Sequence, residues 1–163
     1  MQSLIPRAEK AAAVLKARGE TVAVSESSTG GLISAALLAV PGASAYFIGG
    51  GVVYTRKAGS EILQVAGDAA KGLRSTTEPY ALFVARTMRA KLGASWGIGE
   101  TGATGPAPNR FGDLGRCAVA VVGPRERSAV IDTKSGDRVA NMRAFAAGAL
   151  DLLIACLEDA ENK

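Results

Sequence analysis

The sequence predicts an α/β fold, a three-layer α/β/α sandwich with a mixed sheet. Short apolar runs typical of strands alternate with longer segments of helical spacing, which indicates helices layered on a sheet. Two consecutive strand-like runs, "RCAVAVVG" and "RSAVIDT", are joined by the turn "GPRE", which predicts an antiparallel pair between Cys117 and Asp132. No linker, repeat or low-complexity segment interrupts the chain, so we expect one domain over residues 1–163.

The first part of the chain predicts two helices around a short buried strand. The first helix ends at Gly19, and its apolar residues follow helical spacing: Ile5, Ala8, Ala12 and Leu15. "TVAV", residues 21–24, is predicted to be a buried strand, and "LISAALLAV", residues 32–40, an apolar helix. The stretch "SESSTGGL" then forms the turn that joins them.

The next strand-like run, "AYFIGGGVVYT", residues 45–55, contains three glycines in succession. Such glycines indicate a bulge, a bend or close contact with another backbone. We expect a short helix at residues 61–65. A longer helix then begins at a Thr N-cap, has Pro79 in its first turn and ends at Gly93, with a predicted apolar face of Leu82, Ala85, Met88 and Leu92.

The last strands and helix complete the predicted sandwich. "SWGIGET", residues 95–101, is a buried strand that runs into a glycine-rich turn, "TGATGP", and "NRFGDLG", residues 109–115, is an exposed loop. From Gly136 a long helix is expected to pack across the sheet through an unbroken apolar stripe: Val139, Met142, Ala146, Leu150, Leu153 and Leu157.

The composition excludes several kinds of catalytic site. The chain has no histidine, so it cannot form a Ser-His-Asp triad, a Cys-His dyad or a histidine-based metal site. Its two cysteines, Cys117 and Cys156, lie far apart and are expected to be buried thiols. Any chemistry must therefore use hydroxyls, carboxylates, lysines, arginines and backbone amides, and we expect no metal and no cofactor.

Charge and hydropathy limit the classes of partner that we expect for this chain. The net charge of +4 is modest, the basic residues are scattered and aromatic residues are few, which does not favour nucleic acid and suits a small anionic ligand. No apolar run reaches the roughly 18 residues that span a bilayer, and the N-terminus lacks the pattern of a signal peptide. We expect no membrane partner and a cytoplasmic location.

Two polar turns follow strands of the predicted sheet, where open α/β sheets bind ligands. In "SESSTGGL", a hydroxyl could cap the following helix or act as a nucleophile, and the free N–H groups of the helix start attract anions. The second turn, "TGATGP", has a similar Gly and Thr content. Together they suggest a phosphate cradle, although ordinary tight turns would explain each one separately.

Four stretches carry a resemblance to a known family: "ESSTGGLISAAL", "PGASAYFIGGGVVYT", "TGATGP" and "SGDRVANMRAFAAGAL". In this order they resemble the CinA C-terminal domain family of competence/damage-inducible proteins, the nicotinamide-nucleotide amidohydrolases. The resemblance implies hydrolysis of the carboxamide of nicotinamide mononucleotide (NMN) to nicotinic acid mononucleotide and ammonia, in pyridine nucleotide salvage. It also implies a homodimer or higher homo-oligomer, with the glycine-rich "AYFIGGGVVY" packed against a second subunit.

The resemblance also assigns roles to individual residues. Ser27 would be the nucleophile and Tyr54 a catalytic tyrosine near it, in a Ser-Tyr-Lys type of arrangement. The substrate-binding positions would be Glu26, Thr29, Gly30, Gly31, Thr101, Gly102, Arg138 and Arg143, with helix-start amides holding the phosphate or the oxyanion.

The sequence departs from the family pattern at two lysine positions. The family usually reads Tyr-Ser/Thr-Asn-Glu-Ala-Lys after its strand, whereas this chain has "YTRKAG", which puts Gly59 at the lysine and leaves Lys57 as a substitute base. The family's Lys-Pro-Val-Gly element reads "GDLG", Gly112 to Gly115. The alternative function is therefore a catalytically impaired member that binds a nucleotide or another small phosphate ligand without turnover.

Overall fold

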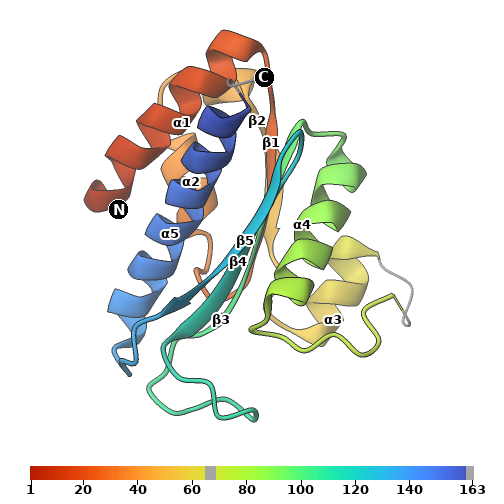
Figure 1. Cartoon of the computed structure of the whole chain (residues 1–163), viewed down its shortest axis with the longest axis vertical. Coiled ribbons are helices and arrows are strands. Elements are labelled where there is room, and N and C mark those ends of the chain that lie inside the picture. Colours follow the sequence, from red (N-terminus) through yellow and green to blue (C-terminus); the bar gives the residue numbers. More distant parts are fainter. Residues whose placement is uncertain (65–68, 161–163) are drawn as a thin grey trace.

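The protein folds into a five-stranded mixed sheet with helices on both faces, in a computed structural model that describes residues 1–64 and 69–160. The strands lie in the order β2-β1-β3-β4-β5 and comprise β1 (Val22–Glu26), β2 (Phe47–Val52), β3 (Trp96–Ala103), β4 (Arg116–Val122) and β5 (Glu126–Asp132). Figure 1 shows α1 (Ile5–Arg18), α2 (Leu32–Leu38) and α5 (Arg138–Asp159) on one face, and α3 (Arg56–Ala58) and α4 (Glu78–Leu92) on the other. The predicted three-layer α/β/α sandwich is confirmed.

Strand directions place the ends of three strands together. β1 pairs in parallel with both β2 and β3, so the carboxyl ends of these three strands meet at one edge of the sheet. β3, β4 and β5 pair antiparallel, which confirms the antiparallel pair predicted between Cys117 and Asp132. The segments that follow β1, β2 and β3 are therefore brought close to one another, as expected for a ligand site in an open α/β sheet.

For the glycine run of β2 the sequence left a bulge, a bend or a close backbone contact open, and the structure shows a bulge just before the run and a close contact within it. The register runs from Val22 opposite Phe47 to Ala23 opposite Gly49, so Ile48 is the extra residue on β2. At Gly50 an added Cβ would lie 2.5 Å from the carbonyl oxygen of Val24, and therefore only glycine fits there. β2 is an edge strand, and Ile48 and Val52 are exposed on it.

Several element boundaries differ from the prediction, because pairing with neighbouring strands extends them. β1 continues through Ser25 and Glu26, which pair with Gly51 and Val52, and β3 continues to Ala103 along β4. Ser25 and Glu26, and likewise Thr101 and Gly102, are thus strand residues rather than turn residues. In the opposite direction, α2 ends at Leu38, before the predicted end at residue 40.

The short helix expected at residues 61–65 begins earlier. α3 starts at Arg56, where the Thr55 side chain caps it by accepting the N–H of Ala58, and continues as the π-helical turn η3 (Gly59–Leu63). Residue 65 lies outside the described residues. Two 3₁₀ turns, η1 (Gln2–Leu4) and η2 (Ala43–Ala45), complete the helical elements of the described chain.

Helix α5 packs across the sheet, with Phe145, Leu150 and Leu153 fully buried. Val139 and Met142 depart from the predicted stripe: Val139 is 55% exposed and Met142 is only partly buried, so the buried apolar face of α5 begins at Phe145. The buried face of α4 also differs from the predicted one and consists of Ala81, Val84, Ala85 and Met88. Leu92, at the exposed end of that helix, is not buried.

Helix α5 is long and largely apolar. With 22 residues, it is long and apolar enough to cross a membrane, judged by length and composition alone. In the structure, however, it packs against α1, α2 and strands β3 to β5. The same criteria are met by the core helices of soluble proteins, so they do not identify a membrane span.

Replacing a buried residue of α5 should therefore be costly, and replacing an exposed one should not. We expect Leu153→Ala to lower the free energy of unfolding by about 2–5 kcal/mol, because it leaves a cavity between α5 and the sheet. Val139→Ala, the matched control on the same helix, should change it by about 0.5 kcal/mol or less. Urea denaturation followed by circular dichroism measures both, and equal losses would contradict this packing.

Candidate functional site

A cleft of about 930 Å³ opens at the sheet edge where the carboxyl ends of β1, β2 and β3 meet. Its walls come from Ser27 after β1, residues 53–56 after β2, and Thr101 and Gly102 at the end of β3. The segment of residues 70–76, α4 and residues 109–111 complete the lining. The cleft therefore lies where the fold predicts a ligand site.

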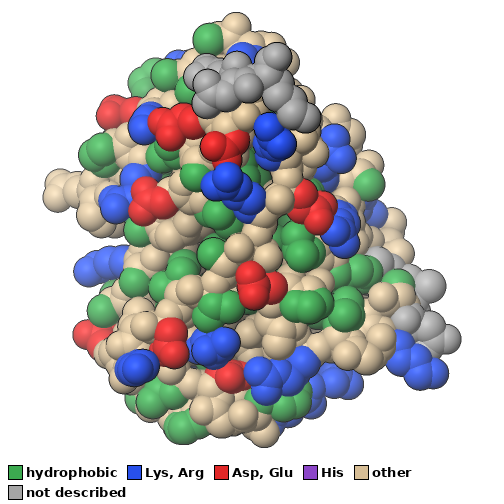
Figure 2. Space-filling view, in the orientation of Figure 1, with side chains coloured by type: hydrophobic (Ala, Val, Ile, Leu, Met, Phe, Trp, Pro, Cys, Tyr) green, Lys and Arg blue, Asp and Glu red, His purple; other side chains and the backbone are tan. Residues whose placement is uncertain are grey.

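The charged residues of this lining are all basic. Arg56, Lys71 and Arg110 line the cleft, and no Asp or Glu does so within residues 1–64 and 69–160. Figure 2 shows basic side chains gathered along the lower edge of one face of the molecule. A cleft lined by one sign of charge concentrates ligands of the opposite sign, so this cleft suits an anion.

Aromatic rings accompany these cations. Tyr54, Tyr80, Phe83 and Phe111 line the cleft, and the guanidinium carbon of Arg110 lies 4.6 Å from the centre of the Phe111 ring. Burial raises the pKa of Tyr80, and the nearby Arg56 opposes this effect, so the Tyr80 phenol stays protonated at neutral pH. Rings beside cations favour a ligand that is both planar and anionic.

Beneath the cleft, Glu26 caps the start of α2 with its buried carboxylate. One of its oxygens, Oε2, accepts the N–H groups of Gly31 and Ile33, both at 3.0 Å, and the other accepts the Ser34 N–H at 2.8 Å. The helix start was predicted to offer free N–H groups to a phosphate or an oxyanion. Instead, the anion at this helix start is the chain's own Glu26, which suits the positive end of the helix dipole.

A second buried carboxylate, that of Glu100 on β3, holds the residues just before α2. Oε2 of Glu100 accepts the N–H groups of Ser27 at 2.8 Å and Thr29 at 3.0 Å, and Oε1 accepts the Ser28 hydroxyl. Sequence reasoning missed Glu100 as a site residue. The available signal was an acidic residue inside the predicted buried strand "SWGIGET".

Two further contacts join this pair of carboxylates to each other and to β4. The Thr29 hydroxyl lies between them, 2.7 Å from Oε2 of Glu26 and 2.8 Å from Oε2 of Glu100. The Cys117 thiol lies 3.4 Å from Oε1 of Glu100. Burial first, and then the charge of Glu100, raises the pKa of Cys117 well above its usual value, so this thiol stays neutral and is a poor nucleophile.

Ser27 is the hydroxyl of this turn that faces the cleft. The hydroxyls of Ser28 and Thr29 are buried and donate to carboxylates, whereas Ser27 is only half-buried and lines the cleft. Among the described residues, its hydroxyl has no hydrogen-bond partner. The arrangement leaves this one oxygen able to meet a ligand.

The other predicted site residues divide into two groups. Tyr54, Thr101 and Gly102 line the cleft, and Arg138 reaches it indirectly, because it donates to the Tyr54 hydroxyl at 3.2 Å. Lys57 and Arg143 are exposed and are not part of the cleft lining. The structure thus does not bring Lys57, the substitute base expected from the sequence, to Ser27.

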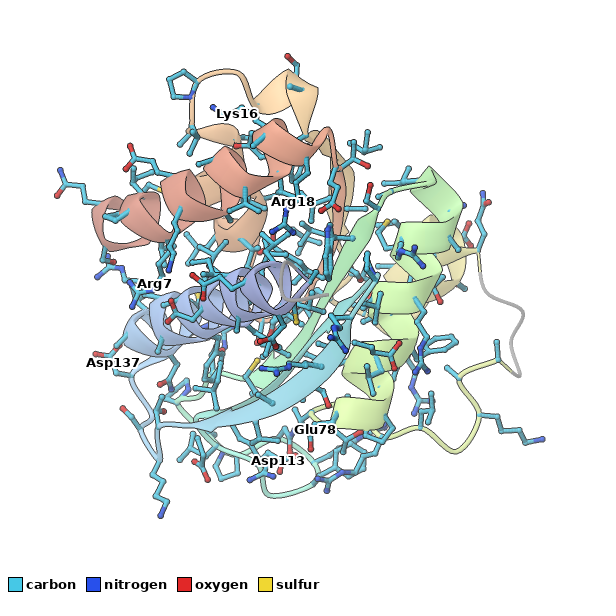
Figure 3. The ribbon with its side chains drawn as sticks, turned by 45° about the horizontal axis from the view of Figure 1, so that its top comes forward. Arg7, Lys16, Arg18, Glu78, Asp113 and Asp137 are labelled. Carbon is cyan, nitrogen blue, oxygen red and sulfur yellow. The ribbon has the colours of Figure 1, made fainter. Side chains whose placement is uncertain are left out.

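Asp113 lies at the second departure from the family pattern and holds the loop of residues 109–115 against the segment before α4. Its carboxylate accepts the Thr76 hydroxyl at 2.5 Å and the Asn109 amide at 3.2 Å, and lies 3.6 Å from Arg74. Figure 3 shows Asp113 in this loop, at the end of the sheet where α4 begins. Asp113 therefore holds one wall of the cleft against the segment that precedes α4.

The described residues hold no group of three or more His, Cys, Asp or Glu side chains arranged to bind a metal ion. Glu26 and Glu100 form no ion pair with a Lys or Arg in that part of the chain. Their charge is balanced by backbone N–H groups and hydroxyls. The polar machinery of the site thus consists of hydroxyls, amides, two buried carboxylates and basic side chains at the cleft.

Comparison with known proteins gives consistent matches. The family model described as "CinA C-terminal domain" matches residues 5–157. A CinA-like protein of Anaeromyxobacter sp. (strain K) is 40% identical over 148 residues, which cover 89% of this chain and 36% of that protein. A CinA-like protein of Gloeobacter violaceus is 36% identical and is covered over 29% of its length. The chain thus spans about a third of the length of the curated relatives.

Solved structures show the same fold. A competence/damage-inducible protein of Agrobacterium tumefaciens is 26% identical, with a TM-score of 0.82 over 95% of both chains. A CinA superfamily protein of Klebsiella pneumoniae has a TM-score of 0.88 over 96% of this chain and 98% of that one. Its identity of 23% supports similarity of the fold alone.

The close packing at Gly102 leads to a test of this site. In Gly102→Ala the new Cβ would lie 2.4 Å from the Ser28 hydroxyl and 3.0 Å from Cβ of Cys117. We expect a loss of about 1–3 kcal/mol in the free energy of unfolding, because both neighbours are buried and cannot move freely. Gly59→Ala is the control, since its Cβ would meet only Val53, at 3.9 Å. Thermal unfolding should show no loss for this control.

Proposed function

The chain belongs to the CinA C-terminal domain family, and from this membership we propose that it is an amidohydrolase of nicotinamide mononucleotide. The reaction would convert the carboxamide to a carboxylate and release ammonia. The observation that carries the proposal is the position of Ser27. Its hydroxyl faces a cleft whose charged lining residues are basic and whose walls include aromatic rings.

The lining suits both ends of this substrate. The phosphate group is anionic and would be held by Arg56, Lys71 and Arg110 rather than by the amides at the start of α2, which Glu26 already occupies. The nicotinamide ring is planar and positively charged, and would stack on aromatic faces such as Tyr80 and Phe83. Ring and phosphate would thus be held by different parts of one cleft.

The chemistry would proceed through an acyl-enzyme. The Ser27 oxygen attacks the carboxamide carbon, the carbon–nitrogen bond breaks, and the nitrogen leaves as ammonia after receiving a proton. Water then hydrolyses the ester and regenerates the serine. The attacking hydroxyl needs a proton acceptor within reach, and the exposed Lys57 lies outside the cleft. We therefore place this role among the groups that line the cleft, with Tyr54, whose hydroxyl oxygen accepts a hydrogen bond from Arg138, as the candidate.

A specific observation supports the second candidate function, nucleotide binding without turnover. Gly59 stands where the resemblance expects a lysine, and it lines the cleft. The space a side chain would need there is open, because an added Cβ would have only Val53 within 4 Å. The cleft thus keeps room for the family's amine but does not contain it, which leaves binding intact and removes a base.

Ser27→Ala distinguishes the chemical step from binding. If the protein is an amidohydrolase, this change should abolish nearly all ammonia release from NMN and leave the dissociation constant within about 3-fold, because the cations hold the phosphate. Ser60→Ala is the matched control, since the Ser60 hydroxyl also lies at the cleft but donates to the Lys57 carbonyl. Ammonia release and calorimetric titration measure the two quantities. A wild type that binds NMN but releases no ammonia would overturn the enzyme and favour the binder.

Two variants, one that removes a lysine and one that adds a lysine, test which residue accepts the proton of the Ser27 hydroxyl. We expect Lys57→Ala to leave turnover unchanged, because this side chain lies outside the cleft; a loss of about 10²–10⁴-fold would return the role to Lys57. Gly59→Lys should raise ammonia release over the wild type, because Gly59 has a helical backbone conformation and room for an amine beside the cleft. Gly59→Ala controls for the backbone change. Equal rates for the Gly59→Lys and Gly59→Ala variants would show that the absence of an amine at residue 59 does not limit turnover.

A further inference from the structure

We propose that Glu100 is a positioning residue for Ser27, and that it sets which groups of the turn face the cleft. Glu100 lies at the centre of the polar network below the turn and does not line the cleft itself. The description of Ser27 as a nucleophile rests on the proposed function. The positioning of its backbone does not, and can be measured in a protein without turnover.

The contacts of Glu100 cover the first three residues of the turn that precedes α2. Ser27 contributes its N–H, Ser28 its hydroxyl, and Thr29 both its N–H and its hydroxyl. Hydrogen bonds to a carboxylate are roughly twice as strong as those between neutral groups. One side chain, 1% exposed, therefore ties three consecutive residues to the middle of the sheet.

This network sorts the three hydroxyls of the turn. Those of Ser28 and Thr29 point inward to the carboxylates, which leaves the Ser27 hydroxyl at the cleft. Gly102 supports the sorting, because a side chain at that position would fill the space of the Ser28 hydroxyl. The Ser28 and Thr29 hydroxyls thus occupy the positions beside the carboxylates, and the Ser27 hydroxyl is the one that remains at the cleft.

Glu26 has a different task, which makes it a matched comparison. Its carboxylate serves the first turn of α2, through Gly31, Ile33 and Ser34. The two acidic residues are equally buried and are linked by the Thr29 hydroxyl, but they hold separate sets of amides. Removing one charge should therefore disturb one set of amides more than the other.

The arrangement has a consequence for the chemistry. The N–H groups of Ser27 and Thr29 point at Glu100, so they do not face a ligand in the cleft. In acyl transfer, backbone N–H groups at the nucleophile commonly stabilise the oxyanion. In this chain these two N–H groups are therefore not available to an oxyanion, and Glu100 contributes by holding the serine in place.

The test compares Glu100→Gln with Glu26→Gln by ¹H–¹⁵N NMR and amide hydrogen exchange on the full chain. In the wild type, the amides of Ser27 and Thr29 should exchange slowly, although both belong to a turn. Glu100→Gln should shift these two resonances and speed their exchange by about 10-fold or more, because the bonds to a charged acceptor are lost. Glu26→Gln should act mainly on Gly31, Ile33 and Ser34.

The result that overturns the inference is equally direct. Fast exchange of Ser27 and Thr29 in the wild type, or unchanged resonances in Glu100→Gln, would show that Glu100 does not hold them. If Glu100→Gln fails to fold, by circular dichroism, the wild-type exchange rates and the shorter Glu100→Asp variant supply the same comparison.

A kinetic measurement separates positioning from a general loss of structure. With ammonia release from NMN as the readout, Glu100→Gln should lower kcat by about 10–100-fold and leave KM within about 2-fold, because a displaced nucleophile affects the chemical step. A rise in KM with unchanged kcat would contradict the positioning role. If the wild type shows no turnover, the proposed enzyme fails, while the NMR comparison still decides whether Glu100 positions Ser27.

Discussion

Two buried carboxylates, Glu26 at the end of β1 and Glu100 on β3, organise the polar end of this sandwich. Each is 1% exposed, and neither forms an ion pair within the described residues. A buried charge without such compensation is strongly unfavourable, so the surrounding chain must supply hydrogen bonds. It does so with the amides and hydroxyls of residues 27–34, and this requirement fixes the path of the chain between β1 and α2.

This constraint explains the composition of the turn. Ser28, Thr29 and Ser34 supply hydroxyls to the carboxylates, and the two glycines adopt left-handed conformations, with φ of 64° at Gly30 and 98° at Gly31. The turn resembles an anion-binding loop, but its N–H groups and hydroxyls already bind the carboxylates of Glu26 and Glu100. Under the proposed function, an external anion would bind farther out, in the cleft, where the described charged lining residues are basic.

The departures from the family pattern have different structural meanings. Gly59 leaves open space in the cleft lining, so a side chain at this position would not disturb the packing. Asp113 has a structural task, because it joins Thr76, Asn109 and Arg74 and so holds one wall of the cleft. The chain therefore keeps the family fold and a ligand cleft, while the groups placed to act on a ligand differ from those the resemblance implies.

The sequence by itself determined the order of the elements, the sandwich and the turn that carries Ser27, because hydrophobic periodicity and glycine punctuation are local properties of the chain. Only the tertiary structure decided how far β1 and β3 extend, since pairing with neighbouring strands sets their ends. It also decided that Lys57 lies outside the cleft, and that Glu100, 73 residues from Ser27 in the chain, holds its amide. Such contacts depend on which strands are neighbours in the sheet and on which side chains are buried between them. The local pattern of residues determines neither.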